Sequence, residues 1–346
     1  MRVVITGGAG FLGSRVARKI LERGTLTGAD GTQHPVRELV LFDLATAFPG
    51  NARDPARVAP AAGFDDARVK VVTGDVADAA VLRQLIGSDT QSVFHLAAIV
   101  SGQAEAEFDL GMRINFDATR HLLEALRALP QPARLVFSSS LAVFGATGPD
   151  DMPETIRDDT ALTPLSSYGI QKAMGEMLVN DYSRKGFVDG RALRLPTITV
   201  RPGKPNAAAS SFASGIIREP LNGVETTVPV SPDTKMWVLS PRTVVDSLIA
   251  GHEVDGSAFG RFRAVSVPGM QMRVGDMADA LRRVAGPEVA SLIKWQLDSR
   301  IERIVSTWPS NFDCAKGLGL GMKADTDFDD NIRAYIADER PSAVAS

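Results

Sequence analysis

The chain has 346 residues, a formal net charge of −3 at pH 7, 44% hydrophobic residues and 23% charged residues. This length suits one large domain with a smaller appended lobe. The weak net charge gives no basic face for nucleic acid or for an anionic membrane, so we expect neither as a partner. Cys314 is the single cysteine, which excludes an internal disulfide, and the four histidines form no cluster at ligand spacing, so we expect no metal.

Two further absences in the sequence bear on where the protein works. No stretch approaches the ~20 apolar residues that span a bilayer. The apolar run at the N-terminus is too short for a signal peptide and stops at Gly7. We therefore expect a soluble cytoplasmic protein.

The chain begins with a strand and a glycine-rich turn. Residues 3–5 are a β-branched run without polar alternation, typical of a parallel strand buried on both faces. Gly7, Gly10 and Gly13 follow, and a helix is expected to about Gly24. Gly7 would permit a tight turn, Gly10 would let a pyrophosphate approach the backbone, and Gly13 would let the helix pack close to the strand. We interpret this stretch as a dinucleotide-binding turn; a purely structural loop is the alternative.

Short apolar runs then alternate with helical segments. Strands are expected at residues 39–42, 69–72, 92–95, 134–137 and 192–195, and helices at 78–87, 105–129 and 166–185. This alternation predicts an α/β protein with a Rossmann-type, doubly wound parallel sheet. Residues 1–200 are expected to form the dinucleotide-binding domain. Residues 201–346, broken by prolines and including a strand at 236–239 and a capped helix at 241–253, would mainly form a smaller substrate-binding lobe, with some segments free to return to the first domain.

Asp43 stands at the end of the second expected strand. A carboxylate there would accept hydrogen bonds from the adenosine ribose and repel a 2′-phosphate, which favours NAD over NADP. An ordinary aspartate that caps the strand is the alternative.

Tyr168 and Lys172 lie one turn apart on the helix expected at 166–185. A free phenol has a pKa of ~10, and a nearby ammonium lowers it, so the pair predicts a base that works near neutral pH. A buried tyrosine beside a solvated lysine is the alternative for such a spacing. Ser138, Ser139 and Ser140 end the strand at 134–137, at the sheet edge where ligands bind in such folds.

Together these motifs resemble the extended short-chain dehydrogenase/reductase family. The matching pieces follow the family's order over residues 3 to about 200: Gly7-x-x-Gly10-x-x-Gly13, Asp43, Gly74-Asp75-Val76, His95-Leu96-Ala97-Ala98, Ser138-Ser139-Ser140, Tyr168-x-x-x-Lys172 and Arg194-Leu195-Pro196. The resemblance implies NAD as the cofactor. Its implied binding residues are Gly7, Gly10, Phe11, Leu12, Gly13, Asp43, Asp75, Val76, Leu96, Ala97, Ala98, Ser138, Tyr168, Lys172, Leu195, Pro196 and Thr197.

The resemblance also implies catalytic roles. Tyr168 would be the acid/base, and Lys172 would lower its pKa and hold the nicotinamide ribose. Ser140 would hydrogen-bond the reacting oxygen. Asn115 would support the helix near Lys172, with an exposed polar side chain as the alternative.

The substrate is predicted from smaller similarities. Nucleotide-sugar members carry an asparagine just after the sixth strand, where this chain has Leu195-Pro196-Thr197, which is closer to the L-threonine dehydrogenases. The segments 101–105, 181–190 and 205–221 are similar to bacterial members that oxidise the C2 hydroxyl of D-erythronate, a four-carbon sugar acid, with NAD. A small sugar acid is therefore the expected substrate.

The expected substrate needs partners for its carboxylate and its hydroxyls. Arg201 is the candidate for the carboxylate, and Ser101, Gln103 and Ser211 are candidates for the hydroxyls. Ser140 and Tyr168 would contact the hydroxyl on the reacting carbon. A surface or structural role is the alternative for Arg201 and for each of the three hydroxyl candidates.

Three other functions stay open at this point. A nucleotide-sugar epimerase or dehydratase would show no net redox change, and an L-threonine dehydrogenase would act on an amino acid. A non-catalytic NAD-sensing protein is the third, although the intact set Ser140, Tyr168 and Lys172 argues against it. The family also implies a homodimer formed through the helices near 105–128 and 166–185.

Overall fold

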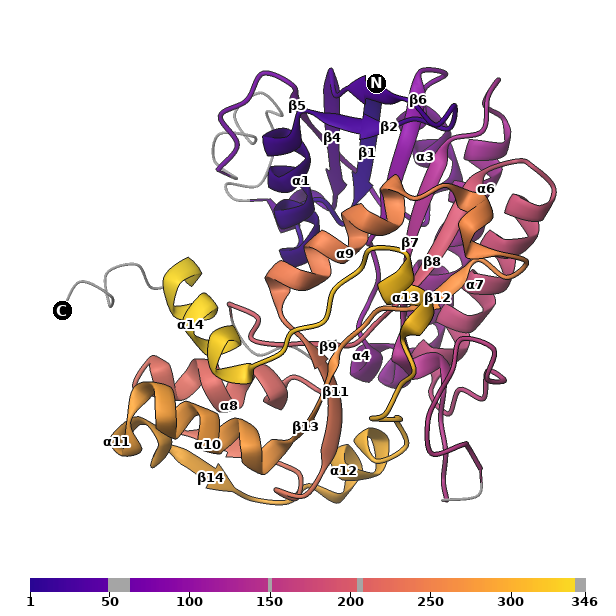
Figure 1. Ribbon diagram of the computed structural model, residues 1–346. Helices are drawn as coiled ribbons and strands as arrows, with labels where there is room; N and C mark the ends of the chain where they lie inside the picture. The colour runs from indigo at the N-terminus through magenta and orange to yellow at the C-terminus, as the bar shows by residue number, and fades with distance from the viewer. Residues whose placement is uncertain (49–62, 149–150, 204–207, 340–346) are drawn as a thin grey trace.

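The computed structural model describes residues 1–48, 63–148, 151–203 and 208–339. Residues 205–207, part of one segment that carries the resemblance, lie outside this description. Seven parallel strands of the described residues are β1 Arg2–Thr6, β4 Glu38–Asp43, β5 Val69–Thr73, β6 Thr90–His95, β7 Arg134–Ser140, β8 Asp189–Leu195 and β12 Ala264–Ser266. They form one sheet in the order β12-β8-β7-β6-β1-β4-β5 (Figure 1).

The strand order places a ligand crevice at the centre of this sheet. The chain runs outward from β1 to β4 and β5, and then returns to β6 on the other side of β1. Ligands of doubly wound sheets bind at the carboxyl ends of the strands where the order reverses. Six of the strands match the predicted ones, which confirms the predicted Rossmann-type α/β fold; β12 was not predicted.

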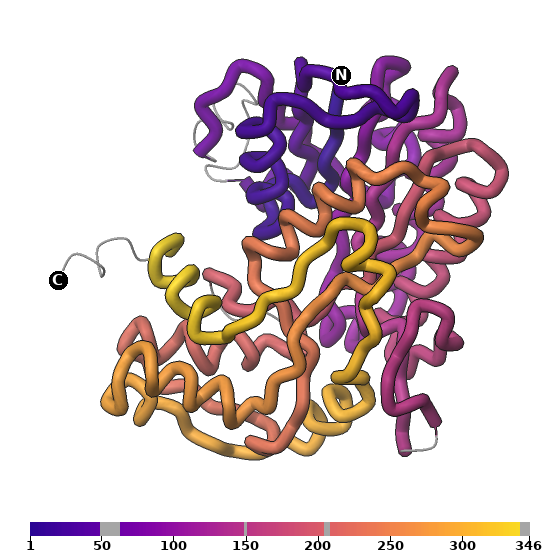
Figure 2. Tube along the Cα trace, in the orientation of Figure 1, coloured from indigo at the N-terminus to yellow at the C-terminus, as the bar shows by residue number. Residues whose placement is uncertain are grey.

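Helices cover both faces of the sheet (Figures 1 and 2). On one face, α1 (Phe11–Arg23) and α9 (Pro241–Glu253) lie side by side; α1 packs on β1 and β4, and α9 packs on β7 and β8. On the other face lie α3 (Ala79–Leu85), α6 (Ala118–Arg127) and α7 (Ser167–Arg184). A strand buried on both faces needs no polar alternation, which is why residues 3–5 are apolar throughout.

The prediction of one continuous helix at residues 105–129 is wrong. The chain instead forms α4 (Ser101–Ala106), a break at Glu107, α5 (Phe108–Gly111), a π-helical turn Met112–Asp117 and then α6. Gly111 marks the close approach to α7, because a Cβ there would lie 2.6 Å from Nε2 of Gln171. Tertiary packing against α7 thus overrides the helical periodicity of this stretch.

After α1 the chain forms a small antiparallel hairpin of β2 (Thr25–Thr27) and β3 (Gln33–Pro35). The later part of the chain forms its own small sheets. These are β9 (Thr197–Ile198), β11 (Lys235–Leu239) and β13 (Met270–Arg273) in one sheet, and β10 (Thr226–Val228) with β14 (Ile293–Trp295) in another. The predicted strand at 236–239 and helix at 241–253 are confirmed as β11 and α9.

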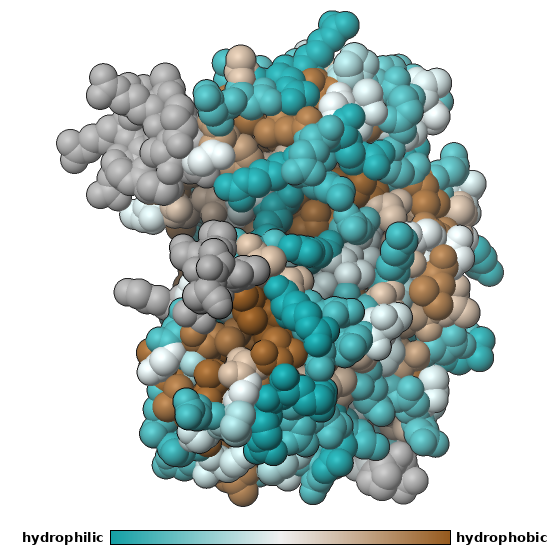
Figure 3. Space-filling view, turned by 60° about the vertical axis from the view of Figure 1, so that its left-hand side comes forward, coloured by the Kyte–Doolittle hydropathy of each residue, from teal (hydrophilic) through white to brown (hydrophobic). Residues whose placement is uncertain are grey.

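Most of the other α-helices of the described residues lie around these small sheets, and α13 packs on β12 of the large one. These other helices are α8 (Phe212–Leu221), α10 (Val274–Ala285), α11 (Pro287–Ala290), α12 (Ser299–Val305), α13 (Ala315–Gly319) and α14 (Phe328–Glu339). A separate apolar core joins α8, α10 and α14 through Phe212, Met277 and Phe328. Figure 3 shows apolar side chains gathered on the lower part of the molecule, which this lobe forms.

Three segments beyond residue 200 lie with the large sheet: β12 is one of its strands, α9 packs on β7 and β8, and α13 packs on β12. The division of the chain at residue 200 stays a prediction. Among the described residues, no helix is long and apolar enough to cross a membrane. In the same part of the chain, no three His, Cys, Asp or Glu side chains are grouped as metal ligands.

Candidate active site

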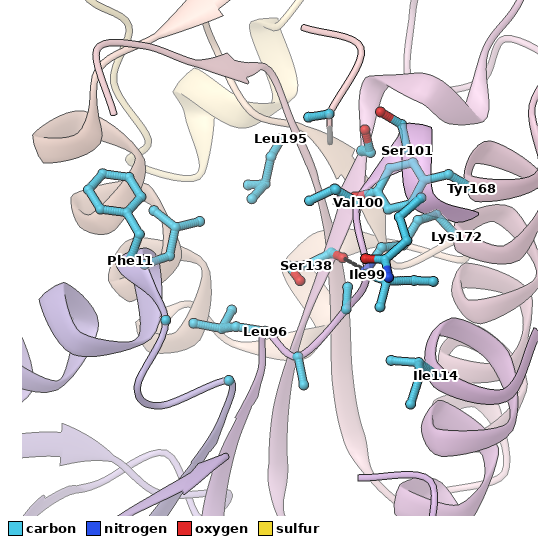
Figure 4. Close-up of a pocket in the computed structure, with 18 of the residues that line it drawn as sticks. Phe11, Leu96, Ile99, Val100, Ser101, Ile114, Ser138, Tyr168, Lys172 and Leu195 are labelled. Carbon is cyan, nitrogen blue, oxygen red and sulfur yellow. Dashed lines mark hydrogen bonds between the residues drawn. The ribbon is translucent and has the colours of Figure 1, made fainter. Parts of the chain in front are cut away.

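A cavity of about 730 Å³ lies at the carboxyl ends of the central strands, between the sheet and the lobe (Figure 4). It brings together most of the residues singled out from the sequence. Its lining includes Gly7, Gly10, Phe11, Leu12, Gly13, Asp43, Asp75, Val76, Leu96, Ala97, Ala98, Ser101, Gln103, Ser138, Ser140, Tyr168, Lys172, Leu195, Pro196, Thr197 and Arg201. Two predicted residues, Asn115 and Ser211, are not among the lining residues.

The glycine turn forms one end of the cavity. Gly7 has φ +73°, a conformation that favours glycine, and a Cβ on Gly7 would lie 2.8 Å from the amide nitrogen of Ala97. A Cβ on Gly13 would lie 2.1 Å from the carbonyl oxygen of Gly7. The N-cap of α1 is Gly10, which has no side chain to occupy the first-turn amides. Helix, turn and strand therefore pack closely and leave a backbone cradle that fits the phosphates of a dinucleotide.

Asp43 both holds this turn and faces the cavity. Its Oδ2 accepts a hydrogen bond from the amide of Ala9 at 3.1 Å, and its Oδ1 accepts one from the amide of Leu44 at 2.8 Å. Burial raises the pKa of this carboxyl, and the backbone hydrogen bonds oppose that effect. The position of Asp43 would allow it to contact a bound ribose. Asp43 also caps the end of its strand, as the alternative expected, because it accepts these backbone hydrogen bonds.

Arg113 is a cavity residue that the sequence did not reveal. It comes from the π-helical turn, and its guanidinium pairs with Asp75, whose other carboxylate oxygen accepts from the amide of Ala77 at 2.9 Å. In the sequence Arg113 was one of several charged residues in an expected long helix. The contact with Asp75 depends on tertiary structure, so no local pattern signalled it.

The other end of the cavity carries the hydroxyl and amine groups. The Nζ of Lys172 donates to the carbonyl oxygen of Ser138 at 2.8 Å and lies 5.6 Å from the ring centre of Tyr168. The Tyr168 phenol hydrogen-bonds with Ser140. Figure 4 shows Tyr168 and Lys172 on α7 beside Ser138 at the end of β7, across the cavity from Phe11. This group can hold a substrate hydroxyl and exchange its proton.

Burial dominates the electrostatics of this pair. It raises the pKa of Tyr168 to about 12, while the hydrogen bond from Ser140 and the charge of Arg201 act in the opposite direction. It lowers the pKa of Lys172 to about 7, while Glu176 acts to raise it. Burial therefore outweighs the groups that lower the pKa of the phenol, and the cation among them is Arg201; the expected effect of Lys172 on the phenol stays a prediction.

Asn115 is buried, with 1% of its surface exposed, so the exposed alternative is wrong. Its Oδ1 accepts from the amide of Ile99 at 3.0 Å, and its Nδ2 donates to Oε1 of Gln171 at 2.8 Å. Asn115 thus ties the loop after β6 to α7, one residue from Lys172. The π-helical turn brings it to this position.

The substrate candidates lie where the lobe meets the sheet. Ser101 accepts a hydrogen bond from the amide of Ala209 at 3.3 Å, and Gln103 donates to Glu107 at 3.0 Å. Ser210 lines the cavity in place of the predicted Ser211. Arg201 is half-buried, and both burial and the neighbouring Arg218 lower its pKa.

Trp308 also lines this end of the cavity and was not predicted. Its segment is held against the chain after β7 by a hydrogen bond from the amide of Ala146 to the carbonyl of Thr307 at 3.0 Å. More than a hundred residues separate these two partners along the chain. No spacing in the sequence indicates such a contact.

Comparison with known proteins assigns the chain to a family. Residues 3–237 match the model of the NAD dependent epimerase/dehydratase family. The chain is 55% identical over 338 residues to D-erythronate dehydrogenase of Cupriavidus necator, covering 98% of each, and 44% identical over 336 residues to D-erythronate dehydrogenase of Haemophilus influenzae, covering 97% of this chain and 99% of that one. A solved structure of a nucleoside-diphosphate-sugar epimerase from Agrobacterium tumefaciens is similar with a TM-score of 0.86 and 40% identity, covering 98% of this chain and 94% of that one. The chain belongs to the NAD-dependent epimerase/dehydratase family.

Proposed function

We propose that this protein is an NAD-dependent dehydrogenase that oxidises the C2 hydroxyl of a four-carbon sugar acid, D-erythronate. The observation that carries the proposal is the meeting of Tyr168, Ser140 and Arg201 at one cavity, in a chain 55% identical to a D-erythronate dehydrogenase. A hydroxyl-binding pair next to a half-buried cation suits a substrate that carries a hydroxyl beside a carboxylate.

The cofactor end of the cavity would hold NAD. The first-turn amides of α1 would bind its pyrophosphate, Asp43 its adenosine ribose, and Lys172 its nicotinamide ribose. Bound NAD would supply the hydride acceptor and one more positive charge near the phenol.

Tyr168 would act as the general base. Its pKa is raised by burial, so the positive charges around it have to favour the phenolate. As the C2 hydroxyl gives its proton to Tyr168, the C2 hydrogen leaves with its electron pair, and a 2-oxo acid results. Ser140 would hydrogen-bond the same oxygen and hold it beside the base. Asn115 would fix α7 from behind.

Arg201 would bind the substrate's carboxylate. Its side chain is half-buried, and its charge lowers the pKa of the Tyr168 phenol. Burial and Arg218 both disfavour its charge, so an anion next to it would be stabilised. Ser101, Gln103 and Ser210 line the cavity as candidates for the remaining hydroxyls, and Ser211, outside the lining, becomes the weaker candidate.

A nucleotide-sugar epimerase is the second candidate, because the structure from Agrobacterium tumefaciens carries such a name. The test mixes purified protein and NAD with D-erythronate, L-threonate, L-threonine or UDP-glucose in separate reactions and follows NADH absorbance. NADH with D-erythronate alone supports the proposal. NADH with L-threonine alone contradicts it. Conversion of UDP-glucose without net NADH favours the epimerase.

We also infer a homodimer. Ile170 and Met177 lie seven residues apart on one face of α7 and are 45% and 51% exposed, which supports contact with a second copy. Light scattering of the wild-type protein and of Met177→Glu tests it: a dimer that the variant dissociates supports the inference, and a monomeric wild type contradicts it.

We place the protein in the cytoplasm, where NAD is abundant and a lone cysteine such as Cys314 stays reduced. Fractionation of bacterial cells that make the protein, followed by an immunoblot of each fraction, tests this location. Recovery in a periplasmic or membrane fraction would contradict it.

A further inference from the structure

A buried ion pair lies behind the cavity and takes no part in the reaction steps above. Glu176 and Arg194 approach to 2.9 Å, and their side chains are 0% and 1% exposed. We propose that Glu176 is the counter-ion that keeps Lys172 charged and in position, and is thus a positioning residue of the site. The inference deepens the proposed function, on which it rests for the role of Lys172.

The helix itself brings Glu176 into line with the site. Tyr168, Lys172 and Glu176 follow at intervals of four on α7, so they share the face that packs on β7 and β8. Lys172 is 2% exposed, and its amine also lies 4.8 Å from the ring centre of Phe137 on β7. An ammonium in such surroundings has lost most of its water and needs a fixed negative charge nearby.

The carboxylate of Glu176 is fixed by hydrogen bonds from two residues, Ser139 and Arg194. Its Oε1 accepts a hydrogen bond from the hydroxyl of Ser139 at 2.5 Å, and Ser139 lines the cavity together with Ser138 and Ser140. Its two oxygens also accept from Nε and Nη2 of Arg194 at 3.0 and 2.9 Å. Arg194 in turn donates to the carbonyl of Asp158 at 3.2 Å. A carboxylate held in this way cannot turn away from Lys172.

Among the groups around Lys172, Glu176 supplies the negative charge that offsets the charge of the ammonium. Burial lowers the pKa of Lys172, and Glu176 opposes that effect. His95 on β6 also faces Lys172, but burial and the charge of Lys172 lower its pKa to about 3, so it is neutral. Tyr168 is protonated at neutral pH and so carries no negative charge there. Arg194 is a cation that donates to the carboxylate of Glu176. Among the described residues, the negative charge that holds the proton on Lys172 is that of Glu176.

Removal of this charge has a predictable sign. In Glu176→Gln the attraction is lost, so the pKa of Lys172 falls further below its ordinary value and the amine loses its proton at a lower pH. Lys172 binds ribose hydroxyls most strongly as an ammonium donor. The affinity for NADH should therefore weaken with rising pH, and the midpoint of this change should move down by about one pH unit in the variant.

The experiment measures NADH binding by fluorescence between about pH 6 and about pH 9, which needs no substrate. The matched control is Ser139→Ala, which removes a hydrogen bond to the same carboxylate but keeps its charge. A shifted midpoint in Glu176→Gln and an unchanged midpoint in Ser139→Ala support the inference. No shift in Glu176→Gln, or equal shifts in both variants, would overturn it.

Circular dichroism checks that each variant folds. Should Glu176→Gln not fold, Glu176→Asp replaces it, because the shorter side chain draws the charge away from Lys172 and should shift the midpoint less, in the same direction. An unshifted midpoint there contradicts the inference. Failure of the wild-type protein to oxidise D-erythronate would refute the proposed function and leave the NADH result to decide the role of Glu176.

Discussion

The two ends of the cavity are built in different ways. The cofactor end consists of short loops that each follow a strand of one sheet, so Gly7, Asp43, Asp75 and Ala97 meet because their strands are neighbours. The substrate end is assembled from Arg201 and Ser210, which are near each other in the chain, and from Trp308, which stands about a hundred residues later. Local motifs therefore define the cofactor end, whereas the substrate end depends on how the lobe packs on the sheet.

Tyr168→Phe should have the largest effect, because the base stands where the two ends meet. We expect turnover to fall by about 10²- to 10⁴-fold, the contribution of a positioned acid/base. Because burial raises the pKa of the phenol, wild-type turnover should also rise with pH, and the variant should lose that dependence. Initial rates of NADH formation measure both. Unchanged NADH binding is the control, and near-full turnover of the variant would refute the proposed base.

Arg201→Met should damage the substrate end alone. Loss of a hydrogen bond to a charged group costs ~1.5–3 kcal/mol, so kcat/KM for D-erythronate should fall by about 10- to 100-fold. Arg201→Lys keeps the charge but not the forked donors, so its kcat/KM should lie between those of Arg201→Met and the wild-type protein. Steady-state kinetics with D-erythronate report on the substrate end of the cavity, and NADH titrations report on the cofactor end. An equal loss of NADH affinity would assign Arg201 to the cofactor end.

Gly13→Ala should damage the cofactor end and the fold together. The added Cβ would lie 2.1 Å from the carbonyl oxygen of Gly7, and overpacking of this kind lowers the free energy of unfolding by ~1–3 kcal/mol. Urea unfolding and NADH titration measure the effect. The matched control is Gly319→Ala in α13, where a Cβ meets nothing within 4 Å and the change should stay within about 0.5 kcal/mol. Similar stability of the two variants would contradict close packing at Gly13.

Asp43→Ser should have the smallest effect, on the choice of cofactor. Without the carboxylate, repulsion of a 2′-phosphate disappears, and a partly exposed charge contributes up to ~1 kcal/mol, so the preference for NAD over NADP should fall about five-fold. The ratio of kcat/KM for the two cofactors measures it. An unchanged ratio would mean that another group reads the ribose.

The sequence by itself determined six strands of the sheet, the glycine turn and the line of Ser140, Tyr168 and Lys172. These features follow from local rules, because apolar runs specify buried strands, and a spacing of four places two side chains on one helical face. Asn115 was also found, through the resemblance, although its contacts need the π-helical turn.

Only the tertiary structure decided the rest. The strand β12, the break at Glu107 and the approach of Trp308 arise from contacts between segments far apart in the chain. The protonation of Tyr168 and Lys172 was also decided there, because a pKa depends on the water that burial removes and on charges such as Glu176 and Arg201. Spacing along the chain brings two groups together, but it does not specify how much water surrounds them.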